Sequence, residues 1–484
     1  LSMGLTALVT ADLGSFPLLW VIPLGLYLLT FVIAFKEKRF VTVAFLSKAQ
    51  LLATVPLIGI FIINGGSYAT SWITTLVPLA AFFFSALWCH MRLADDRPKP
   101  TSLTEYYLWM SLGGALGGSF NAFVAPLLFS YPVEFILIAA STLLLHRAAP
   151  RPAVIGLLFV ATFLALAALY LLHSYAVEFI VPILVALLLT PLVLTFYPRL
   201  LALSVFLIVL FTQTAFVARD RVAIARNFFG VVEVVDRKNA KGDAWRFYVN
   251  GSGVHGMQSL TLEPTGFKRN LTYLNPVKAL ADIFVFTDVG VLGAGPAMAM
   301  CLSEKQKATT IYEIDPLSKE TAEQHFSYIK ECGQPTWRMG DGRLELARDV
   351  SARYDLLIID AFTAGSVPLH LLTAEALAIY TQRLKNTGIL LFNTNNLYYN
   401  FGPAILALTK QAGMQAWEHH ANPKPDFLNG IATSNWILVT QSDHAFNQSA
   451  LSALGWTKME QSEEFPIWTD ELANVLATLK FLHK

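Results

Sequence analysis

Eight apolar runs in the first 218 residues constrain this chain more than any other feature. They cover residues 16–35, 49–63, 72–90, 107–129, 133–145, 153–172, 176–196 and 200–218. A helix that crosses the hydrocarbon core of a bilayer needs about 20 apolar residues, and most of these runs meet that requirement. The short runs 49–63 and 133–145 predict helices with little tilt, helices that extend past a flanking polar residue, or partly inserted segments. We therefore expect residues 1–218 to form a polytopic α-helical membrane domain.

The composition agrees with a chain that is partly dissolved in lipid. Hydrophobic residues make up 55% of its 484 residues and charged residues only 14%, whereas about a quarter of a typical soluble protein is charged. The formal net charge is +1, so no strong field favours nucleic acid as a partner. Three cysteines, Cys89, Cys301 and Cys332, are too few and too scattered to predict a disulfide framework or a zinc cluster, and we expect them to be packing residues.

Lys and Arg residues gather in broadly alternate loops between the runs, at 36–48, 92–99, 147–151 and 199, as the positive-inside rule requires. Strict alternation over eight spans, however, puts everything after residue 218 on the opposite face. That placement conflicts with Arg219, Arg221 and Arg226, and with a cytosolic metabolite as ligand. We therefore expect that one span is miscounted and that the C-terminal part lies in the cytosol, as in a protein of the bacterial inner membrane.

Two polar or small-residue features interrupt the apolar part. In the run 111–119, Gly113 and Gly117 lie four residues apart, as do Gly114 and Gly118, a spacing that predicts close approach of helix backbones in lipid. Three carboxylates lie near the ends of apolar runs, where we expect solvation at the membrane interface: Glu105, Glu134 and Glu178.

After residue 226 the pattern changes to short strands. Residues 229–235, 245–249 and 254–260 are rich in β-forming residues, and Asn250-Gly251 is a tight-turn signal before the third of them. We expect a small antiparallel β unit within residues 219–274.

From residue 275 onwards, apolar strands alternate with helical patterns. The expected strands are 289–292, 309–314, 335–339, 356–359, 389–393 and 436–440, and the expected helices include 316–326, 373–384 and 401–411. This alternation predicts an open, mainly parallel α/β sheet, a Rossmann-like domain over residues 275–484.

A Gly-rich loop follows the first of these strands. Gly293 and Gly295 allow a sharp turn and a close approach of the backbone to a ligand, before a helix expected at 297–302. About twenty residues further on, the second strand ends in a pair of acids, and a carboxylate at that tip is placed to accept hydrogen bonds from both ribose hydroxyls. Glu313 is the preferred ribose ligand, with Asp315 as the neighbouring alternative.

The next two strands also end in acids. Asp341, beside Gly342, is placed to accept a hydrogen bond from an adenine amino group, and Asp360 enters the crevice at the carboxyl edge of the sheet. Each acid alone is explained by a helix cap, but signals at four successive strand ends predict a nucleoside site of the class I S-adenosylmethionine type. The third glycine of a dinucleotide-binding loop is missing, because position 298 is Met.

The order of these motifs resembles the spermidine synthase, or polyamine aminopropyltransferase, family. Three segments are similar to the membrane-fused branch of that family: 16–30, 103–114 and 360–373. The resemblance implies transfer of an aminopropyl group from decarboxylated S-adenosylmethionine to an amine, with release of methylthioadenosine. It also implies that no metal is needed, and that the partners are a small-molecule amine and the lipid bilayer, not nucleic acid. A homodimer is an open alternative.

The resemblance further implies roles for individual residues. Glu313 would hold the ribose, Asp341 the adenine, and Asp360 would orient or deprotonate the attacking amine. Gln258 and Tyr273 resemble a Gln and a Tyr that line the same crevice.

The sequence departs from the family pattern where acids are usual. Pro296 stands where the family has an Asp that holds the donor's amine, and Ala297 follows where Gly is usual. Thr363 stands in place of a second acid after Asp360. The donor could therefore be S-adenosylmethionine itself, or the acceptor could be less cationic than a diamine. A methyltransferase and a non-enzymatic nucleoside sensor of a membrane transport domain stay open as alternatives.

Several further polar residues are candidates for the site. His255 and His370 could act as bases near neutral pH or serve as structural hydrogen-bonding groups. A group of asparagines after the fifth strand could bind a polar substrate or form turns: Asn393, Asn395 and Asn396. The pair His419-His420 lacks further ligands at metal-binding spacing, so we expect no metal there.

Overall fold

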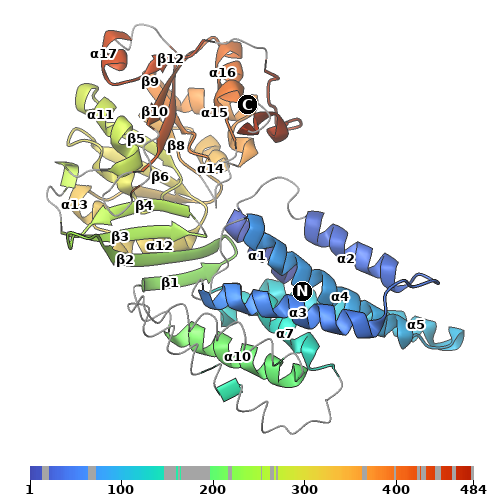
Figure 1. The fold of residues 1–484 in the computed structure, drawn as a ribbon. Coiled ribbons are helices and arrows are strands. Elements are labelled where there is room, and N and C mark those ends of the chain that lie inside the picture. The colour runs from blue at the N-terminus through green and yellow to red at the C-terminus, as the bar shows by residue number, and fades with distance from the viewer. Residues whose placement is uncertain are drawn as a thin grey trace. The chain divides into compact units, whose positions relative to one another are not determined.

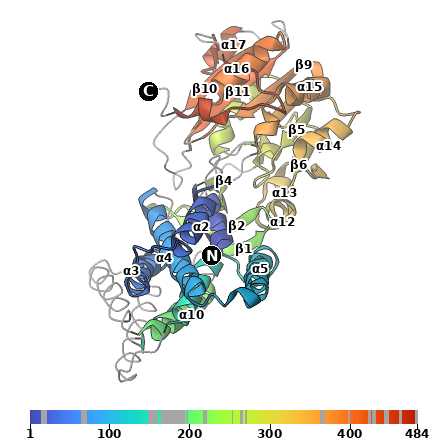
Figure 2. The ribbon, with the colours of Figure 1, turned by 90° about the vertical axis from the view of Figure 1, so that its right-hand side faces the viewer.

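The computed structural model describes the chain in two compact units, Leu1–Val231 and Val232–Lys484. The described residues are 1–13, 21–63, 72–146, 160–161, 164, 194, 197–215, 221–251, 253–261, 266–268, 271–361, 368–396, 399–421, 426, 432–441, 448–460 and 465–480. Figures 1 and 2 show the helices of the first unit and the sheets that follow them in the chain.

The described part of the first unit is mainly helical up to residue 215. Its described α-helices are α1 (Ser2–Leu13), α2 (Val21–Ala34), α3 (Val43–Ile63), α4 (Trp72–Asp95), α5 (Leu103–Ser119), α6 (Ala125–Leu128), α7 (Glu134–Leu143) and α10 (Pro198–Ala215). Three helical stretches among the described residues are long and apolar enough to cross a membrane: Val43–Phe61, Thr75–Asp95 and Pro100–Leu128. The predicted class, apolar helices before an α/β domain, is confirmed, and membrane anchoring is suggested by the composition of these helices.

The predicted spans agree with the structure unevenly. The short run 49–63 belongs to the 21-residue helix α3, which starts before the run and includes Lys48. This agrees with the alternative that the helix extends past a flanking polar residue. The other short run forms the 10-residue helix α7. Helix α1 was not predicted. The runs 153–172 and 176–196 lie outside the described residues, apart from isolated positions.

Helix α5 differs from the other two long stretches in its surroundings. Only 6% of its apolar window is buried, compared with 44% for α3 and 50% for α4. A Cβ added at Gly113, Gly114 or Gly117 would meet no atom of the described chain within 4 Å, whereas one at Gly118 would lie 3.5 Å from Sδ of Met3 in α1. Of the four glycines predicted to pack closely, Gly118 therefore has a neighbour in the described part of the protein.

Glu134 corrects the expectation of interfacial solvation. Its side chain is 1% exposed and forms an ion pair with Arg226, at 2.7 Å between Glu134 Oε1 and Arg226 Nη2. Arg226 also donates to Glu134 Oε2 and to the carbonyl of Tyr131, both at 3.0 Å. A buried carboxylate needs such a bidentate partner, because it has lost its hydration. The partner was missed because Arg226 lies in a strand that the sequence pattern did not predict.

That strand opens a four-stranded sheet in the order β1-β2-β3-β4. Its strands are β1 (Arg221–Asn227), β2 (Gly230–Lys238), β3 (Ala244–Asn250) and β4 (Gly253–Ser259). Strands β2, β3 and β4 pair antiparallel, as predicted for the β unit. The turn between β3 and β4 contains Gly251 with φ 57°, the left-handed conformation that the Asn-Gly signal indicated.

The second sheet has eight strands in the order β12-β10-β11-β9-β8-β5-β6-β7. They are β5 (Asp288–Leu292), β6 (Ala308–Glu313), β7 (Thr336–Met339), β8 (Tyr354–Ile359), β9 (Leu384–Asn393), β10 (Gln415–Ala421), β11 (Ser434–Thr440) and β12 (Thr457–Lys458). Strands β5 to β9 pair in parallel, whereas β10, β11 and β12 add to the edge of β9 antiparallel. The sheet is therefore mixed, and β10 and β12 were not predicted.

Helices cover this sheet on both faces. The α-helices are α11 (Asn275–Ile283), α12 (Pro316–His325), α13 (Tyr328–Cys332), α14 (Gly342–Arg348), α15 (Ala374–Arg383), α16 (Gly402–Gln411) and α17 (Gln448–Ala453). Helix α11 lies on one side of the sheet, and α14, α15 and α16 lie on the other (Figure 1). Strands β8, β9 and β11 carry runs of buried apolar residues, the pattern of strands covered on both faces.

The strand order fixes where a ligand crevice forms. After β5 the chain moves to one side for β6 and β7, and then crosses to the other side of β5 for β8 and β9. In an open α/β sheet, ligands bind outside the carboxyl ends of the strands at such a reversal. The carboxyl ends of β5, β6 and β8 carry Gly293, Glu313 and Asp360.

Candidate functional site

The Gly-rich loop after β5 turns through three left-handed residues. Gly293, Gly295 and Ala297 have φ values of 93°, 47° and 64°. A Cβ added at Gly293 would lie 2.3 Å from the carbonyl oxygen of Asp360, so only glycine fits there. Ala297 adopts the left-handed region at a cost of about 1 kcal/mol. The helix predicted at 297–302 is instead a single 3-10 turn, η5 (Met298–Cys301), because the left-handed Ala297 directly precedes it.

Strand β4 packs closely on this loop. A Cβ added at Gly256 would lie 2.3 Å from Cγ of Pro296. The Pro296 ring is therefore packed against the β4 backbone. Pro296 is the residue that, by the family resemblance, stands in place of an Asp. Because a buried apolar ring replaces that acid, the loop itself offers no carboxylate to a cationic ligand.

Glu313 ends β6 and is tied to the Gly-rich loop. Its Oε2 accepts a hydrogen bond from the Ala294 amide at 2.7 Å, and its Oε1 accepts one from the Asp315 amide at 2.8 Å. Burial raises the pKa of Glu313, although these backbone hydrogen bonds oppose the rise. Asp315, the alternative ribose ligand, caps helix α12 by accepting a hydrogen bond from the Leu317 amide at 2.9 Å.

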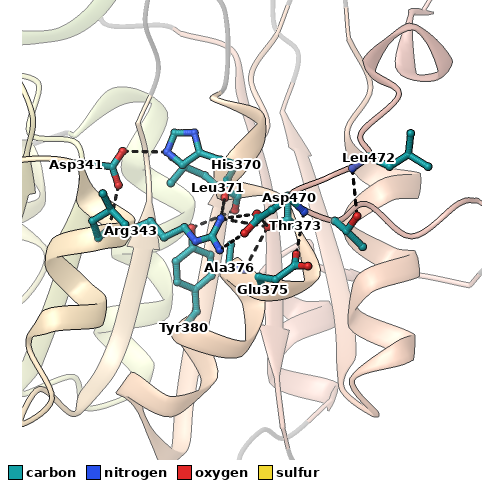
Figure 3. A network of polar contacts seen from close by, with 12 residues as sticks. Asp341, Arg343, His370, Leu371, Thr373, Glu375, Ala376, Tyr380, Asp470 and Leu472 are labelled. Carbon is teal, nitrogen blue, oxygen red and sulfur yellow. Dashed lines mark hydrogen bonds and ion pairs between the residues drawn. The ribbon is translucent and has the colours of Figure 1, made fainter.

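Asp341 and His370 form a pair at the tip of β7 (Figure 3). Asp341 caps α14 by accepting a hydrogen bond from the Leu344 amide at 2.9 Å, and its Oδ2 lies 3.0 Å from Nε2 of His370. His370 lies in the 3-10 turn η6 (Leu369–Leu371) with a half-exposed side chain. A Cβ added at Gly342 would lie 3.0 Å from Leu292 in β5. The structure thus brings three predicted residues together, Asp341, Gly342 and His370.

Sequence reasoning missed a network beside this pair. Arg343 donates to both carboxylate oxygens of Asp470, at 2.6 and 2.7 Å, and to the carbonyl of His370 at 2.8 Å. Thr373 also donates to Asp470, at 2.8 Å. Figure 3 shows Arg343 lying between the α15 end of the network and Asp341. These contacts hold the C-terminal segment at the start of α15, and no local pattern links residues that are 127 positions apart.

Asp360 follows β8 and is held by two side chains. Its Oδ2 accepts a hydrogen bond from the Tyr273 hydroxyl at 2.9 Å, and its Oδ1 accepts one from the side-chain Nδ2 of Asn393 at 2.7 Å. Burial raises the pKa of Asp360 to about 7, against the lowering effect of both hydrogen bonds. A carboxylate with that pKa can accept and release a proton near neutral pH.

Residues of strand β11 hold Tyr273 through its backbone carbonyl. It lies in the 3-10 turn η4 (Thr272–Leu274), and its carbonyl accepts hydrogen bonds from Ser434 Oγ at 2.6 Å and Trp436 Nε1 at 2.9 Å. The Tyr273 and Trp436 rings are parallel, with centroids 6.3 Å apart. Burial and the neighbouring Asp360 carboxylate raise the pKa of Tyr273, so its hydroxyl stays protonated and donates. The contributions of Ser434 and Trp436 were not predicted.

The asparagines after β9 divide between the two predicted roles. Asn393 contacts Asp360 and also accepts a hydrogen bond from the Asn395 amide at 2.9 Å. Asn395 in turn accepts one from the amide of Asn435 in β11 at 2.9 Å. Asn396 accepts one from the amide of Tyr399 at 3.0 Å, as in a turn. Asn393 is the member of this group that contacts Asp360 directly.

Strand β4 contributes His255 and Gln258. The carbonyl of His255 lies 3.4 Å from the Tyr273 hydroxyl. Burial lowers the pKa of the His255 imidazole to about 4, so the ring is neutral at pH 7, and its Nε2 has no hydrogen-bond partner among the described residues. Gln258 is buried, and its Oε1 accepts a hydrogen bond from the Ser327 amide at 2.8 Å.

The prediction that all three cysteines are packing residues is wrong for two of them. Cys301 at the end of η5 forms a disulfide with Cys332 at the end of α13, while Cys89 is free. Helix α13 is also tied to β4, because the Tyr328 hydroxyl donates to the Met257 carbonyl at 2.6 Å. The Gly-rich loop is therefore restrained on two sides, by β4 and by the disulfide.

His419 and His420 lie in the edge region of the sheet, in strand β10. His420 Nδ1 lies 3.0 Å from Asn435 Oδ1, and Nε2 lies 2.9 Å from Glu418 Oε2. Among the described residues, no group of three His, Cys, Asp or Glu side chains is arranged to hold a metal ion.

A comparison with curated proteins finds a relative that is similar to part of the chain. The chain is 30% identical over 115 residues to a polyamine aminopropyltransferase of Vibrio vulnificus (strain CMCP6); this stretch is 23% of this chain and 38% of that relative. The chain thus matches well under half of the relative's length. No family model matches the chain.

Solved structures are similar at lower identity. A probable spermidine synthase of Corynebacterium glutamicum has a TM-score of 0.39 at 17% identity, covering 50% of this chain and 91% of that one. Spermidine synthase of Thermotoga maritima has a TM-score of 0.33 at 12% identity, covering 54% and 84%. Human methyltransferase-like protein 13, with bound SAH, has a TM-score of 0.30 at 17% identity, covering 38% and 88%. The predicted resemblance is confirmed by the curated relative: this chain carries a domain similar to the spermidine synthases, or polyamine aminopropyltransferases, after a set of apolar helices.

Proposed function

We propose that the protein is a membrane-anchored transferase that moves an aminopropyl group from decarboxylated S-adenosylmethionine to an amine and releases methylthioadenosine. The observation that carries this proposal is the Asp360 carboxyl group. It lies at the carboxyl edge of the sheet beside the Gly-rich loop, is held by Tyr273 and Asn393, and has a pKa raised to about 7 by burial. This is the protonation behaviour that a general base needs at neutral pH.

The reaction assigns a single proton transfer to Asp360. An ammonium group first gives a proton to the carboxylate, because only the neutral amine has a lone pair for attack. The amine nitrogen then bonds to the carbon beside the sulfonium, the carbon–sulfur bond breaks, and its electron pair returns to sulfur. The hydrogen bonds from Tyr273 and Asn393 occupy one lone pair on each oxygen of Asp360, which leaves the others for the ammonium.

The nucleoside is assigned to the opposite side of the crevice. Gly293 and Gly295 allow the loop backbone to approach the ligand, and Glu313 holds the ribose hydroxyls with the lone pairs that its backbone contacts leave free. Asp341 and Gly342 receive the adenine. For His370, predicted as a base or as a structural hydrogen-bonding group, the contact with Asp341 favours a positioning role on this adenine side.

The acceptor is assigned to the space bounded by β4 and the loop after β9. His255, Gln258 and Asn393 are its proposed polar contacts, in addition to Tyr273, whereas Asn396 is assigned to the turn that it forms with Tyr399. His255 is neutral at pH 7, which suits a hydrogen-bonding role better than that of a base for an ammonium group.

Product analysis tests the proposal. The purified protein is incubated with decarboxylated S-adenosylmethionine, with and without amines, and methylthioadenosine is quantified by mass spectrometry. Product that depends on the amine supports aminopropyl transfer. Absence of any product, while the donor still binds, would show that the domain is a nucleoside sensor and not an enzyme.

Methyl transfer is the second candidate, and Pro296 is the observation that favours it. Since this buried ring packs on Gly256, the loop has no carboxylate for the terminal amine of a decarboxylated donor. A methyltransferase would use S-adenosylmethionine and release S-adenosylhomocysteine. Running the same assay with S-adenosylmethionine distinguishes the two reactions by their nucleoside product.

We propose that the transferase domain lies on the cytosolic face of the membrane, because its donor is a cytosolic metabolite. Arg219, Arg221 and Arg226, after the last apolar run, agree with that side. The Cys301–Cys332 disulfide is instead typical of oxidising compartments. Protease accessibility in sealed inverted vesicles decides between them: cleavage of the domain supports the cytosolic face, and protection contradicts it.

A further inference from the structure

The carboxylate to which adenine is assigned is held from two directions. Asp341 Oδ1 accepts a hydrogen bond from the Leu344 amide at 2.9 Å, and Asp341 Oδ2 lies 3.0 Å from Nε2 of His370. A carboxylate oxygen has two lone pairs, so each oxygen of Asp341 keeps one for a further donor. The 6-amino group of adenine is such a donor. The direction in which Asp341 meets this group therefore depends on where the His370 ring lies.

His370 reaches Asp341 from the short turn η6, and two side chains hold the backbone of that turn. Arg343 Nη1 donates to the His370 carbonyl at 2.8 Å, and the Tyr380 hydroxyl donates to the Leu371 carbonyl at 3.1 Å. The His370 side chain itself is half-exposed, so packing around the ring restrains it little. The position of the ring relative to Asp341 therefore follows mainly from the backbone that carries it.

Arg343 connects η6 to the C-terminal segment, residues 465–480 (Figure 3). Its side chain is only 11% exposed and donates to both carboxylate oxygens of Asp470, at 2.6 and 2.7 Å. A guanidinium that has lost most of its hydration needs such a carboxylate partner. Because the pairing is bidentate, it also fixes the orientation of the guanidinium plane. Asp470 thus directs Arg343 towards the His370 carbonyl.

Asp470 is in turn fixed to the start of α15. Its Oδ1 accepts a hydrogen bond from the Thr373 hydroxyl at 2.8 Å, and its backbone amide donates to Glu375 Oε2 at 3.1 Å. Two residues earlier, the carbonyl of the buried Trp468 accepts a hydrogen bond from the Ala374 amide at 2.9 Å. The part of the segment that carries Asp470 is therefore anchored by contacts that do not involve Arg343.

We propose that Arg343 is a positioning residue for recognition of the purine 6-amino group: held by Asp470, it fixes η6 so that His370 orients the Asp341 carboxylate towards that group. The inference rests on the proposed assignment of adenine to Asp341. Arg343 follows Asp341 by two residues at the start of α14, so the contacts close a ring. The ring runs along the backbone to Arg343, across to η6 and back through the His370 side chain. Such support leaves Asp341 little freedom to turn away from the ligand.

Selectivity between two nucleosides tests this proposal. Methylthioadenosine carries a 6-amino group that can donate to Asp341, whereas methylthioinosine carries an oxygen at the same position. From the value of one hydrogen bond to a charged group, the wild type should bind methylthioadenosine about 10- to 100-fold more tightly. In Arg343→Gln this ratio of dissociation constants should fall by about tenfold, because methylthioadenosine loses a contact that methylthioinosine does not make. Calorimetry measures both constants on the full chain, and the melting temperature shows that the variant is folded.

Arg348→Gln is the matched control. Arg348 lies in the same helix as Arg343 and also pairs with an acid, Glu345, but its side chain is largely exposed. This variant should keep the wild-type ratio. A general loss of stability in α14 would weaken binding of both nucleosides alike and leave the ratio unchanged, so the ratio separates positioning from a structural defect.

A double-mutant cycle shows whether Arg343 acts through His370. His370→Ala should lower the ratio by about the same factor as Arg343→Gln, and combining the two substitutions should lower it no further. Additive effects, or a wild-type ratio in folded Arg343→Gln, would overturn the proposal. Equal binding of the two nucleosides by the wild type would contradict the assignment of adenine to Asp341 and this proposal with it, while product analysis would still test aminopropyl transfer. Binding of neither nucleoside would contradict the nucleoside site itself.

Discussion

The two sides of the crevice are built differently. On the nucleoside side, Glu313 and Asp341 accept hydrogen bonds from backbone amides 19 and 3 residues away in the sequence. On the acceptor side, Asp360 is held by the side chains of Tyr273 and Asn393, which lie 87 and 33 residues away. Local backbone contacts follow from a sequence motif, whereas side-chain contacts over such separations follow only from the fold. The contacts on the proposed nucleoside side therefore lie within recognisable sequence motifs, whereas those on the proposed acceptor side depend on how distant segments fold together.

The largest effect is expected from Asp360→Asn. The variant keeps a side chain of the same shape but removes the base, so kcat/KM should fall by about 10²- to 10⁴-fold. Binding of methylthioadenosine, measured by calorimetry, should stay within about threefold of wild type, a difference of under 1 kcal/mol. Loss of both activity and nucleoside binding would show that the two sides are not separable.

Glu313→Gln makes the reciprocal test on the nucleoside side. The amide retains one oxygen but replaces the other by a donor that faces the Ala294 or Asp315 amide. Nucleoside binding should weaken by about 1.5–3 kcal/mol, the value of hydrogen bonds to a charged group. Normal binding of methylthioadenosine by this variant would remove Glu313 from the ribose site.

Reduction of the Cys301–Cys332 disulfide should destabilise the unit that contains the Gly-rich loop. For a closed loop of 31 residues, the chain-entropy estimate is about 3–4 kcal/mol. The measurement is the denaturation midpoint with and without a dithiol reductant, with the Cys301→Ser/Cys332→Ser double variant as the form that no longer responds. A wild-type midpoint that reductant does not move would mean that the two thiols are not linked in the purified protein.

The pH profile tests how Tyr273 affects Asp360. Because Asp360 must be ionised to accept a proton, kcat/KM should rise with pH through about 7, the pKa that burial sets. The Tyr273 hydrogen bond favours the ionised form and so lowers this pKa; Tyr273→Phe should therefore move the rise to higher pH. At a pH well above the shifted pKa the variant should regain much of its activity, which a purely structural defect would not allow. An unshifted profile would separate Tyr273 from the base.

The smallest effect is expected at the network of Figure 3. The Asp470 side chain is 43% exposed, and ion pairs open to water contribute about 0.2–1 kcal/mol. Since Asn keeps one oxygen for Arg343, Asp470→Asn should lower the free energy of unfolding by about that amount, with Asp282→Asn, an exposed acid in α11, as the control for the change in net charge. A loss of several kcal/mol would assign the C-terminal segment a larger structural role than its contacts indicate.

The same contrast explains what the sequence could predict. Gly293, Glu313, Asp341 and Asp360 were found because strand ends recur at regular positions in an α/β pattern, and each such end has a recognisable residue type. The apolar helices were predicted correctly because a long apolar run is by itself enough to indicate a helix of this kind. The domain bounds at residues 218 and 274 stay predictions. The division into compact units between Val231 and Val232 reflects packing and does not test them.

Most of the misses depend on contacts between distant segments. The Cys301–Cys332 bond forms because η5 and α13 lie side by side, and nothing in the spacing of the two cysteines indicates this. Glu134 was assigned to an interface because its partner Arg226 lies in the unpredicted strand β1. Strands β10 and β12 join the sheet antiparallel at its edge, where alternation of strands and helices gives no signal. Such features are energetic consequences of the fold and not of local propensity.

One measurement bears on the whole account: stoichiometric product formation by the full-length protein in detergent or lipid nanodiscs. Decarboxylated S-adenosylmethionine is supplied with a primary monoamine or with a diamine at pH 8, where Asp360 is ionised. We predict equal amounts of methylthioadenosine and aminopropylated amine from the wild type, and neither above background from Asp360→Asn. Equal turnover by wild type and Asp360→Asn, or no turnover by a wild-type protein that binds the donor, would contradict the assignment of Asp360 as the base of an amine-alkylating transferase.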